Sequence, residues 1–145
     1  MKIVLQRVAR ASVSVKGGVI ASINKGLLIL FGVEKFDGNE KIDFLVEKIL
    51  NLRIFPDENG KMNLSCLDIR GEVLVVSQFT LAADCQKGRR PGFDNAAATA
   101  EAKILYKKFI EQISMSGIKV ATGEFGSDMQ IQLINDGPVT FILER

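Results

Sequence analysis

The sequence predicts one domain of mixed α/β class over residues 1–145, with a two-layer, barrel-like β-sheet core flanked by helices. Most of its apolar residues alternate with polar ones or form short continuous runs, and both patterns are typical of strands. Only two longer segments change to the helical period. The order glycine, strand, loop, helix and strand occurs twice along the chain and suggests an internal pseudo-repeat.

Strands are expected first, at the N-terminal end of the chain. Residues 2–10 and 12–23 alternate, and the second segment is expected to fold back at a Gly17-Gly18 turn. Residues 27–33 form a continuous apolar run, as in a strand that is buried on both faces.

A helix over 39–50 is expected next, because its apolar residues return every three or four positions and so share one face. These residues are Ile42, Leu45, Val46, Ile49 and Leu50. A short strand at 53–55 is expected to end at Pro56, before a turn at 57–60.

The second half of the chain follows a similar order. Residues 72–77 are expected to form a buried strand, and 82–93 a long loop. A helix capped by Asp94 or Asn95 is expected to reach about Met115, because an apolar stripe runs along it. The stripe consists of Ala98, Ala102, Leu105, Phe109 and Ile113.

The C-terminal part returns to strands. Gly117 is suited to the left-handed conformation that ends many helices. Three strands are then expected, at 118–121, 129–134 and 139–143.

Composition narrows the class of protein. An apolar fraction of 47% and a charged fraction of 25% are ordinary for a soluble globular domain. No apolar run approaches the roughly 18 residues that cross a bilayer, and charges appear too early for a signal peptide. Cys66 and Cys85 stand apart, which favours a reducing compartment over a disulfide or zinc framework. We therefore expect a cytoplasmic protein.

The chain contains no histidine. This excludes Ser-His-Asp and Cys-His catalysis, imidazole base chemistry and histidine metal ligation. Because the carboxylates are scattered as well, we expect neither a metal nor an organic cofactor. Any hydrolysis must use another base, backbone hydrogen-bond donors or a group on the substrate.

Two motifs lie at strand ends, and each has a purely structural alternative. Ser77-Gln78-Phe79-Thr80-Leu81 lies at the end of an apolar strand. Side-chain hydroxyl groups at such positions commonly form hydrogen bonds to unpaired backbone groups. Asn135-Asp136-Gly137-Pro138-Val139-Thr140 separates two apolar runs and is also typical of a tight hairpin turn. A third segment, Lys87-Gly88-Arg89-Arg90, is either a solvated loop or a nucleic-acid contact.

The two motifs, in this order and at this spacing, resemble the D-aminoacyl-tRNA deacylase family, whose members are editing hydrolases. The resemblance extends from Leu5-Gln6-Arg7-Val8 to the end of the chain. It implies a carboxylic ester hydrolase that removes D-amino acids from tRNA, acts as a homodimer and also accepts glycyl-tRNA. Catalysis would be assisted by the 2′-hydroxyl of the tRNA rather than by a side chain.

The resemblance also implies roles for individual residues. Ser77, Gln78, Phe79 and Thr80 would form the catalytic segment, with the backbone N–H groups of Gln78 and Phe79 as an oxyanion hole. Gly137 and Pro138, joined by a cis bond, would block L-side chains in the partner subunit's active site. Supporting residues would be Arg7 and Thr140, while Phe125-Gly126 would form a wall of the adenosine pocket and Lys87, Arg89 and Arg90 would contact tRNA.

The sequence leaves several alternatives open. Arg7 could be an ordinary strand charge that faces solvent. Thr80 is the one plausible protein nucleophile, although no histidine is present to activate it. The chain could be a non-catalytic tRNA-binding module of the same fold, or a hydrolase of small amino-acid esters that needs no RNA.

Overall fold

A computed structural model describes all residues from Met1 to Arg145. Its core is a mixed sheet in the order β2-β1-β3-β6-β7, with β8 paired to β1, and a separate two-stranded sheet joins β4 and β5. The elements are β1 (Lys2–Val15), β2 (Gly18–Ile23), β3 (Gly26–Gly32), α1 (Asn39–Asn51), β4 (Phe55–Pro56), β5 (Met62–Leu64), β6 (Glu72–Ser77), the 3₁₀ helix η1 (Phe79–Ala82), α2 (Thr99–Ser114), β7 (Val120–Thr122) and β8 (Gln130–Glu144).

The sheet curls into a nearly closed barrel, so that its two faces have separate cores. Leu28, Leu74 and Val76 face the inside of the curl, together with Val8 and Val13 of β1. The alternate residues of the same strands belong to the larger core, which lies between the sheet and the helices. Both faces of β3 and β6 are therefore buried, as their continuous apolar runs predict.

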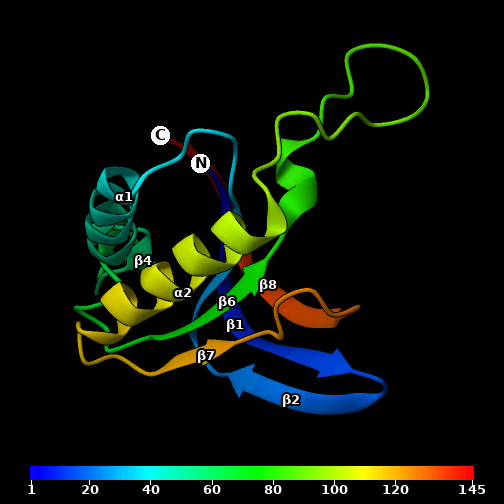
Figure 1. The fold of residues 1–145 in the computed structure, drawn as a ribbon. Helices are drawn as coiled ribbons and strands as arrows, with labels where there is room; N and C mark the ends of the chain where they lie inside the picture. Colours follow the sequence, from blue (N-terminus) through cyan, green and yellow to red (C-terminus); the bar gives the residue numbers. More distant parts are fainter.

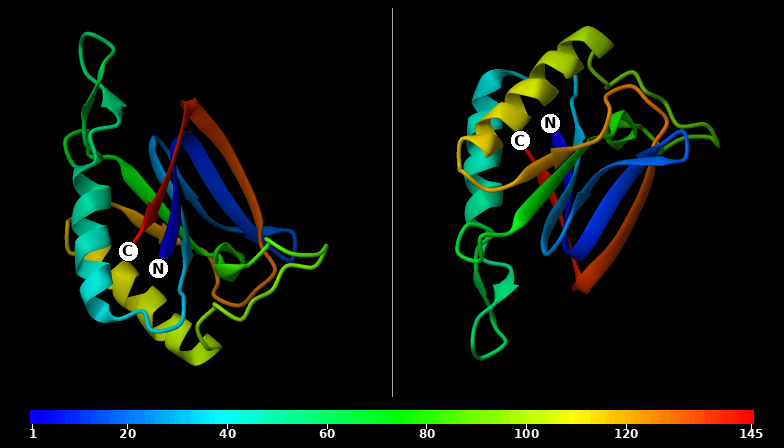
Figure 2. Two further views of the ribbon diagram at one scale, coloured as in Figure 1. Left: turned by 90° about the horizontal axis from the view of Figure 1, so that it is seen from above. Right: turned by 90° about the horizontal axis from the view of Figure 1, so that it is seen from below.

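Both long helices cover the same side of the sheet (Figure 1; Figure 2). Helix α1 buries the five residues that the sequence places on one face. Helix α2 buries Leu105, Phe109 and Ile113 as expected, and also Tyr106. Strands β3 and β6 are parallel and adjacent, and each is followed by one of these helices. The expected mixed, barrel-like α/β architecture is confirmed, and the sequence pseudo-repeat stays a prediction.

Two expectations for the N-terminal strands are wrong. Strand β1 does not break near residue 11 but runs from Lys2 to Val15. Its pairing with β8 shifts register between Gln6 and Arg10, and irregularities of this kind can bend a strand without ending it. The following turn is formed by Lys16 and Gly17, both with positive φ, rather than by Gly17 and Gly18.

Expectations for the connecting segments are also corrected. The short strand expected at 53–55 is instead β4, which pairs with the unforeseen β5 around a turn closed by the Gly60 N–H and the Asp57 carbonyl. Helix α2 begins at Thr99 with Ala98 as its N-cap, not at Asp94 or Asn95. The Asn95 carbonyl instead accepts the Lys35 N–H at 2.9 Å, which keeps this segment extended. The helix ends within one residue of the expected position.

A single long strand, β8, replaces the two strands expected at 129–134 and 139–143. The alternative of a hairpin turn at Asp136-Gly137 is therefore wrong. Val8 pairs with Asn135 and Gln6 pairs with Thr140, so Arg7 alone lies opposite residues 136–139. The motif is a large bulge in an otherwise continuous strand.

None of the helices has the length and apolar character needed to span a lipid bilayer.

Candidate active site

A cavity of about 390 Å³ lies where the parallel strands β3 and β6 end. The carboxyl ends of parallel strands are the usual place for a ligand site in an α/β sheet. Gly32 lies at the end of β3, where the segment around η1 comes very close. A side chain at Gly32 would meet the Gln78 carbonyl and Leu81 at 2.9 Å. Helix η1 can therefore pack directly against the end of β3.

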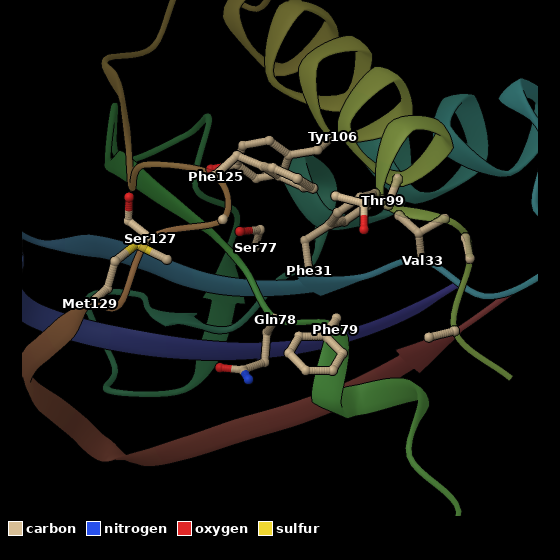
Figure 3. A pocket seen from close by; sticks show the side chains of 14 residues that line it. Phe31, Val33, Ser77, Gln78, Phe79, Thr99, Tyr106, Phe125, Ser127 and Met129 are labelled. Carbon is tan, nitrogen blue, oxygen red and sulfur yellow. The ribbon is translucent and has the colours of Figure 1, made fainter. Parts of the chain in front are cut away.

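The walls of the cavity come from distant parts of the sequence (Figure 3). Phe125 and Tyr106 lie on one side, with ring centroids 5.6 Å apart, and Gln78 and Phe79 lie on the opposite side. The remaining lining residues are Phe31, Val33, Ser77, Ala96, Ala97, Thr99, Ala102, Gly126, Ser127 and Met129. Phe125 and Gly126 thus line the same cavity as Ser77, Gln78 and Phe79.

The lining contains no Asp, Glu, Lys, Arg or Cys side chain. Its one titratable group is the hydroxyl of Tyr106, which donates to the Val75 carbonyl at 2.9 Å. Burial raises the pKa of Tyr106 further above its usual value, so this hydroxyl stays protonated at neutral pH. The cavity offers aromatic surface, hydroxyl groups and backbone, but no side chain that could act as a general base.

The structure places three of the four residues of the expected catalytic segment, 77–80, in the wall of the cavity and leaves the fourth outside it. Ser77, Gln78 and Phe79 line the cavity, whereas Thr80 is exposed and lies outside the lining. The Thr80 hydroxyl accepts a hydrogen bond from the Gln78 side-chain amide at 2.5 Å. Thr80 therefore orients Gln78 rather than facing the cavity itself.

The expectation for the Gln78 backbone is wrong. Its N–H donates to the Phe31 carbonyl at 2.8 Å, because strand pairing extends one residue past β6. It is therefore not free to stabilise an oxyanion. The first N–H groups of a helix lack partners within it, so Phe79 and Thr80, which begin η1, remain the candidate donors.

Gly137 and Pro138 lie at the bulge in β8, are exposed, and are joined by a cis peptide bond. No residue of β8 lines the cavity of the same chain. The structure therefore does not bring this motif together with Ser77–Phe79 within one protomer. It presents the motif on the outside of the fold.

Arg7 supports the bulge from beneath. It is only 8% exposed, so the alternative of a solvent-facing charge is wrong. Its Nε donates to the Asp136 carbonyl at 2.8 Å, and its Nη1 donates to the Ile54 carbonyl at 2.5 Å. The Asp136 carboxylate also lies 3.5 Å from Nε. Through these two hydrogen bonds, the guanidinium group of Arg7 links the bulge to the segment before β4.

Asn135 closes the bulge, a role that the sequence analysis did not assign. Its Oδ1 accepts the Val139 N–H at 2.6 Å, and its Nδ2 donates to the Thr140 hydroxyl at 3.0 Å. Gln6 donates to the same hydroxyl at 3.2 Å. Thr140 therefore holds the far end of the bulge through these two hydrogen bonds. The sequence feature that could have revealed this role is the motif that contains Asn135, because Asn side chains commonly form hydrogen bonds to nearby backbone in turns.

The basic residues Lys87, Arg89 and Arg90 are exposed at the tip of the loop between η1 and α2. Reciprocal backbone hydrogen bonds of 2.8 Å between Asp84 and Gly92 close the base of this loop. The loop projects away from the sheet (Figure 1). None of its three cations has a salt-bridge partner within the chain.

No three His, Cys, Asp or Glu side chains are grouped so as to hold a metal ion. Both cysteines are free thiols, with Cys66 buried and Cys85 exposed. Burial raises the pKa of the Cys66 thiol to about 12. Cys66 is therefore a core residue and not a nucleophile.

Comparison with known proteins links this geometry to a family. The profile of the D-Tyr-tRNA(Tyr) deacylase family matches residues 4–144. A D-aminoacyl-tRNA deacylase of Thermosipho africanus (strain TCF52B) is 56% identical over 144 residues, covering 99% of this chain and 97% of that protein.

Two solved structures share the fold. One, described as a c-Myc DNA Unwinding Element Binding Protein, is 43% identical with a TM-score of 0.94, covering 100% of this chain and 99% of the other. A probable eukaryotic D-amino acid tRNA deacylase has a TM-score of 0.85 at 17% identity, covering 98% of this chain and 97% of the other. From the full-length match and the shared fold, the chain belongs to the D-Tyr-tRNA(Tyr) deacylase family of hydrolytic enzymes.

Proposed function

We propose that this protein hydrolyses the ester bond of D-aminoacyl-tRNA, releasing free tRNA and a D-amino acid. The observation that carries the proposal is the cavity formed by Ser77, Gln78 and Phe79 opposite Phe125 and Gly126, in a chain that matches the family over its full length. An aromatic wall suits the flat base of the terminal adenosine. The backbone N–H groups at the start of η1 suit the ester carbonyl.

We infer that the attacking water is oriented by the 2′-hydroxyl of the terminal adenosine. The lining supplies no side chain that could accept a proton at neutral pH. A hydroxyl carried by the substrate, next to the 3′-ester, would be held in place by binding alone. In that scheme Thr80 positions the Gln78 amide and takes no covalent part.

The selection of D- over L-amino acids is assigned to Gly137 and Pro138 of a second protomer in a homodimer. The D- and L-aminoacyl esters contain the same atoms, so the enzyme must distinguish them by a steric clash with the L-enantiomer. Backbone held rigidly by Arg7 and Asn135 is suited to such a clash. Because the motif is exposed and does not line the cavity of its own chain, it is free to reach the cavity of another protomer.

The outer surface of β8 supports the proposed dimer. Strand β8 pairs only with β1, so its other edge is unpaired, and the side chain of Ile142 in the same strand is 70% exposed. An unpaired strand edge and an exposed apolar side chain are both suited to a protein interface. Glycyl-tRNA should also be a substrate, because glycine carries no side chain for the filter to reject.

The test is release of amino acid from matched D-tyrosyl-, L-tyrosyl- and glycyl-tRNA, together with a D-tyrosine ester that lacks the nucleotide. We expect hydrolysis of the D-tyrosyl and glycyl substrates alone. Equal rates on the ester without RNA would favour a hydrolase of small amino-acid esters. Hydrolysis of the L-substrate at the D-rate would contradict the proposed filter.

A second candidate function is nucleic-acid binding without turnover. It is favoured by the exposed basic loop and by the description of one similar structure as a DNA-element-binding protein. Binding of tRNA with no release of any amino acid in the same assay would support this candidate over the hydrolase.

A further inference from the structure

Two exposed phenylalanine rings meet beside the mouth of the cavity. Phe79 is 59% exposed and Phe93 is 40% exposed. Their ring centroids are 5.0 Å apart and their planes are inclined by 49°. Much of the surface of both rings thus stays in contact with solvent, although they touch each other. The stability of the fold therefore explains only weakly why the two rings lie at this position.

The position of the pair connects two features of the proposed site. Phe79 lines the cavity and begins η1. Phe93 directly follows Gly92, whose hydrogen bonds with Asp84 close the base of the basic loop. The N–H of Ala96, another lining residue, donates to the Phe93 carbonyl at 3.0 Å. The pair thus lies between the cavity and the loop that carries Lys87, Arg89 and Arg90.

The chemistry on either side indicates what would cover these rings. Because Phe79 both lines the cavity and is exposed to solvent, it offers an exit path for a strand of RNA whose terminal nucleoside occupies the cavity. Exposed aromatic rings next to a cluster of cations are the usual arrangement for single-stranded nucleic acid, with bases stacked on rings and phosphates near cations. The three cations favour this occupant over another apolar protein surface, because burying them unpaired would be costly.

We propose that Phe79 and Phe93 form a stacking surface for the base of the nucleotide that precedes the terminal adenosine. This inference rests on the proposed function, because it requires a 3′-terminal adenosine in the cavity. Stacking would depend little on base identity, since every base has a flat face. The pair would set the direction in which the single strand leaves the site and bring its phosphates towards the basic loop.

The test compares three D-tyrosyl esters: adenosine alone, a trinucleotide ending in adenosine, and the same trinucleotide without the base at its middle position. In the parent protein, loss of that base should raise KM by roughly tenfold, or about 1.4 kcal/mol, which is the scale of the stacking of one base on an aromatic side chain. Phe93→Ala should abolish this difference. Its kcat/KM on the adenosine ester should equal that of the parent.

Two variants control for nonspecific effects. Phe93→Tyr keeps a ring and should restore the preference for the intact trinucleotide. Phe44→Ala removes a ring of similar exposure, 43%, on the distant helix α1 and should behave as the parent. The inference would be overturned if Phe93→Ala slowed all three esters equally, or if the parent ignored the missing base.

A binding measurement separates this inference from the proposed function. Uncharged trinucleotides with and without the middle base can be compared by fluorescence anisotropy, with no need for turnover. If the protein hydrolyses no D-aminoacyl ester, the proposed function fails, whatever the binding result. If hydrolysis occurs but Phe93→Ala binds both trinucleotides like the parent, only the stacking surface is wrong. The same holds if Phe93→Ala changes the dimer equilibrium in sedimentation and leaves RNA binding unchanged, since the rings would then be covered by protein.

Discussion

At the scale of single residues, Gly137 combines a backbone conformation that side chains rarely adopt with close neighbours that leave no room for a side chain. Its φ is +144°, and a Cβ there would lie 2.5 Å from Val139 Cγ2 and 3.0 Å from Arg7 Nη2. Both neighbours are held by hydrogen bonds and cannot move away cheaply. The conformation thus requires glycine for reasons of both torsion and space.

Gly137→Ala should therefore displace the bulge and lower D-tyrosyl-tRNA deacylation by at least about tenfold, with a loss of unfolding free energy of about 1–3 kcal/mol from backbone strain. Gly17→Ala is the matched control, because Gly17 also has positive φ but no atom lies within 4 Å of the place that a methyl group would take there. That variant should lose stability only. Full activity in Gly137→Ala would show that the bulge does not take part in the site.

Thr80 lies at the other motif and tests the proposed mechanism. Thr80→Val removes one hydrogen bond to Gln78, so we expect a fall in kcat of less than about tenfold. A substrate that ends in 2′-deoxyadenosine should instead be cleaved at least about a hundredfold more slowly, the usual scale for loss of proton-transfer assistance. Single-turnover kinetics give both numbers. An acyl-enzyme trapped on Thr80 would contradict this mechanism.

At the scale of elements, the loop between β3 and α1 depends on one buried carboxylate. Asp37 accepts hydrogen bonds from Lys41 Nζ at 2.7 Å, from the Glu34 N–H at 2.7 Å and from the Met1 ammonium at 2.8 Å. Burial alone would raise the pKa of Asp37, but these hydrogen bonds outweigh it and hold the pKa below its usual value. The ionised form therefore stabilises the fold.

Asp37→Asn should lower the free energy of unfolding at pH 7 by about 2 kcal/mol, the scale of a hydrogen bond to a charged group. Because the folded pKa is lowered, this stabilisation is complete above the unfolded pKa of about 3.9 and disappears as pH falls through the folded value. Urea titrations between pH 7 and pH 2 should show the parent and variant converging below about pH 4. Asp128→Asn, at an exposed position, is the control and should leave the parent's profile unchanged.

The secondary elements differ in how far the sequence predicts them. The apolar period of α1 and the continuous runs of β3 and β6 predict those elements well, because each buries the residues that form its pattern. The start of α2 could not be predicted, since Asp94 and Asn95 are good caps but lie in a segment held extended by the β3–α1 loop. In β8, the bulge depends on Arg7, which is distant in the sequence.

At the scale of the whole molecule, the formal net charge is only +2, so binding to RNA must depend on where the cations lie. Replacing Lys87, Arg89 and Arg90 together by Ala should weaken tRNA binding and flatten its dependence on salt by about one unit for each phosphate that is no longer neutralised. The D-to-L ratio should not change, because none of the three cations lines the cavity or belongs to strand β8, which carries Gly137. Filter binding at several salt concentrations measures the slope.

The control for that experiment removes the same charge elsewhere. Lys48, Lys61 and Lys107 are exposed on other parts of the surface, and their replacement by Ala should leave the slope near that of the parent. If both triple variants behave alike, the basic loop is only a solvated surface.

The chemistry of the whole chain also predicts independence from metal ions. It has no histidine and no cluster of three side chains that could hold a metal. Protein treated with a chelator and then dialysed should deacylate D-tyrosyl-tRNA at the rate of untreated protein, provided that the tRNA stays folded. Activity that is lost and then restored by one divalent ion would contradict this prediction.

By itself, the sequence determined the α/β class, most strands, the helical face of α1 and the positions of both motifs. These depend on local periodicity and on residue types that have few alternatives in a turn or at a strand end. Only the tertiary structure decided that Thr80 lies outside the cavity, that the Gln78 N–H is already bonded to Phe31, and that Arg7 is buried beneath the bulge. Each of these depends on contacts between residues far apart in the chain, and no local pattern records such contacts.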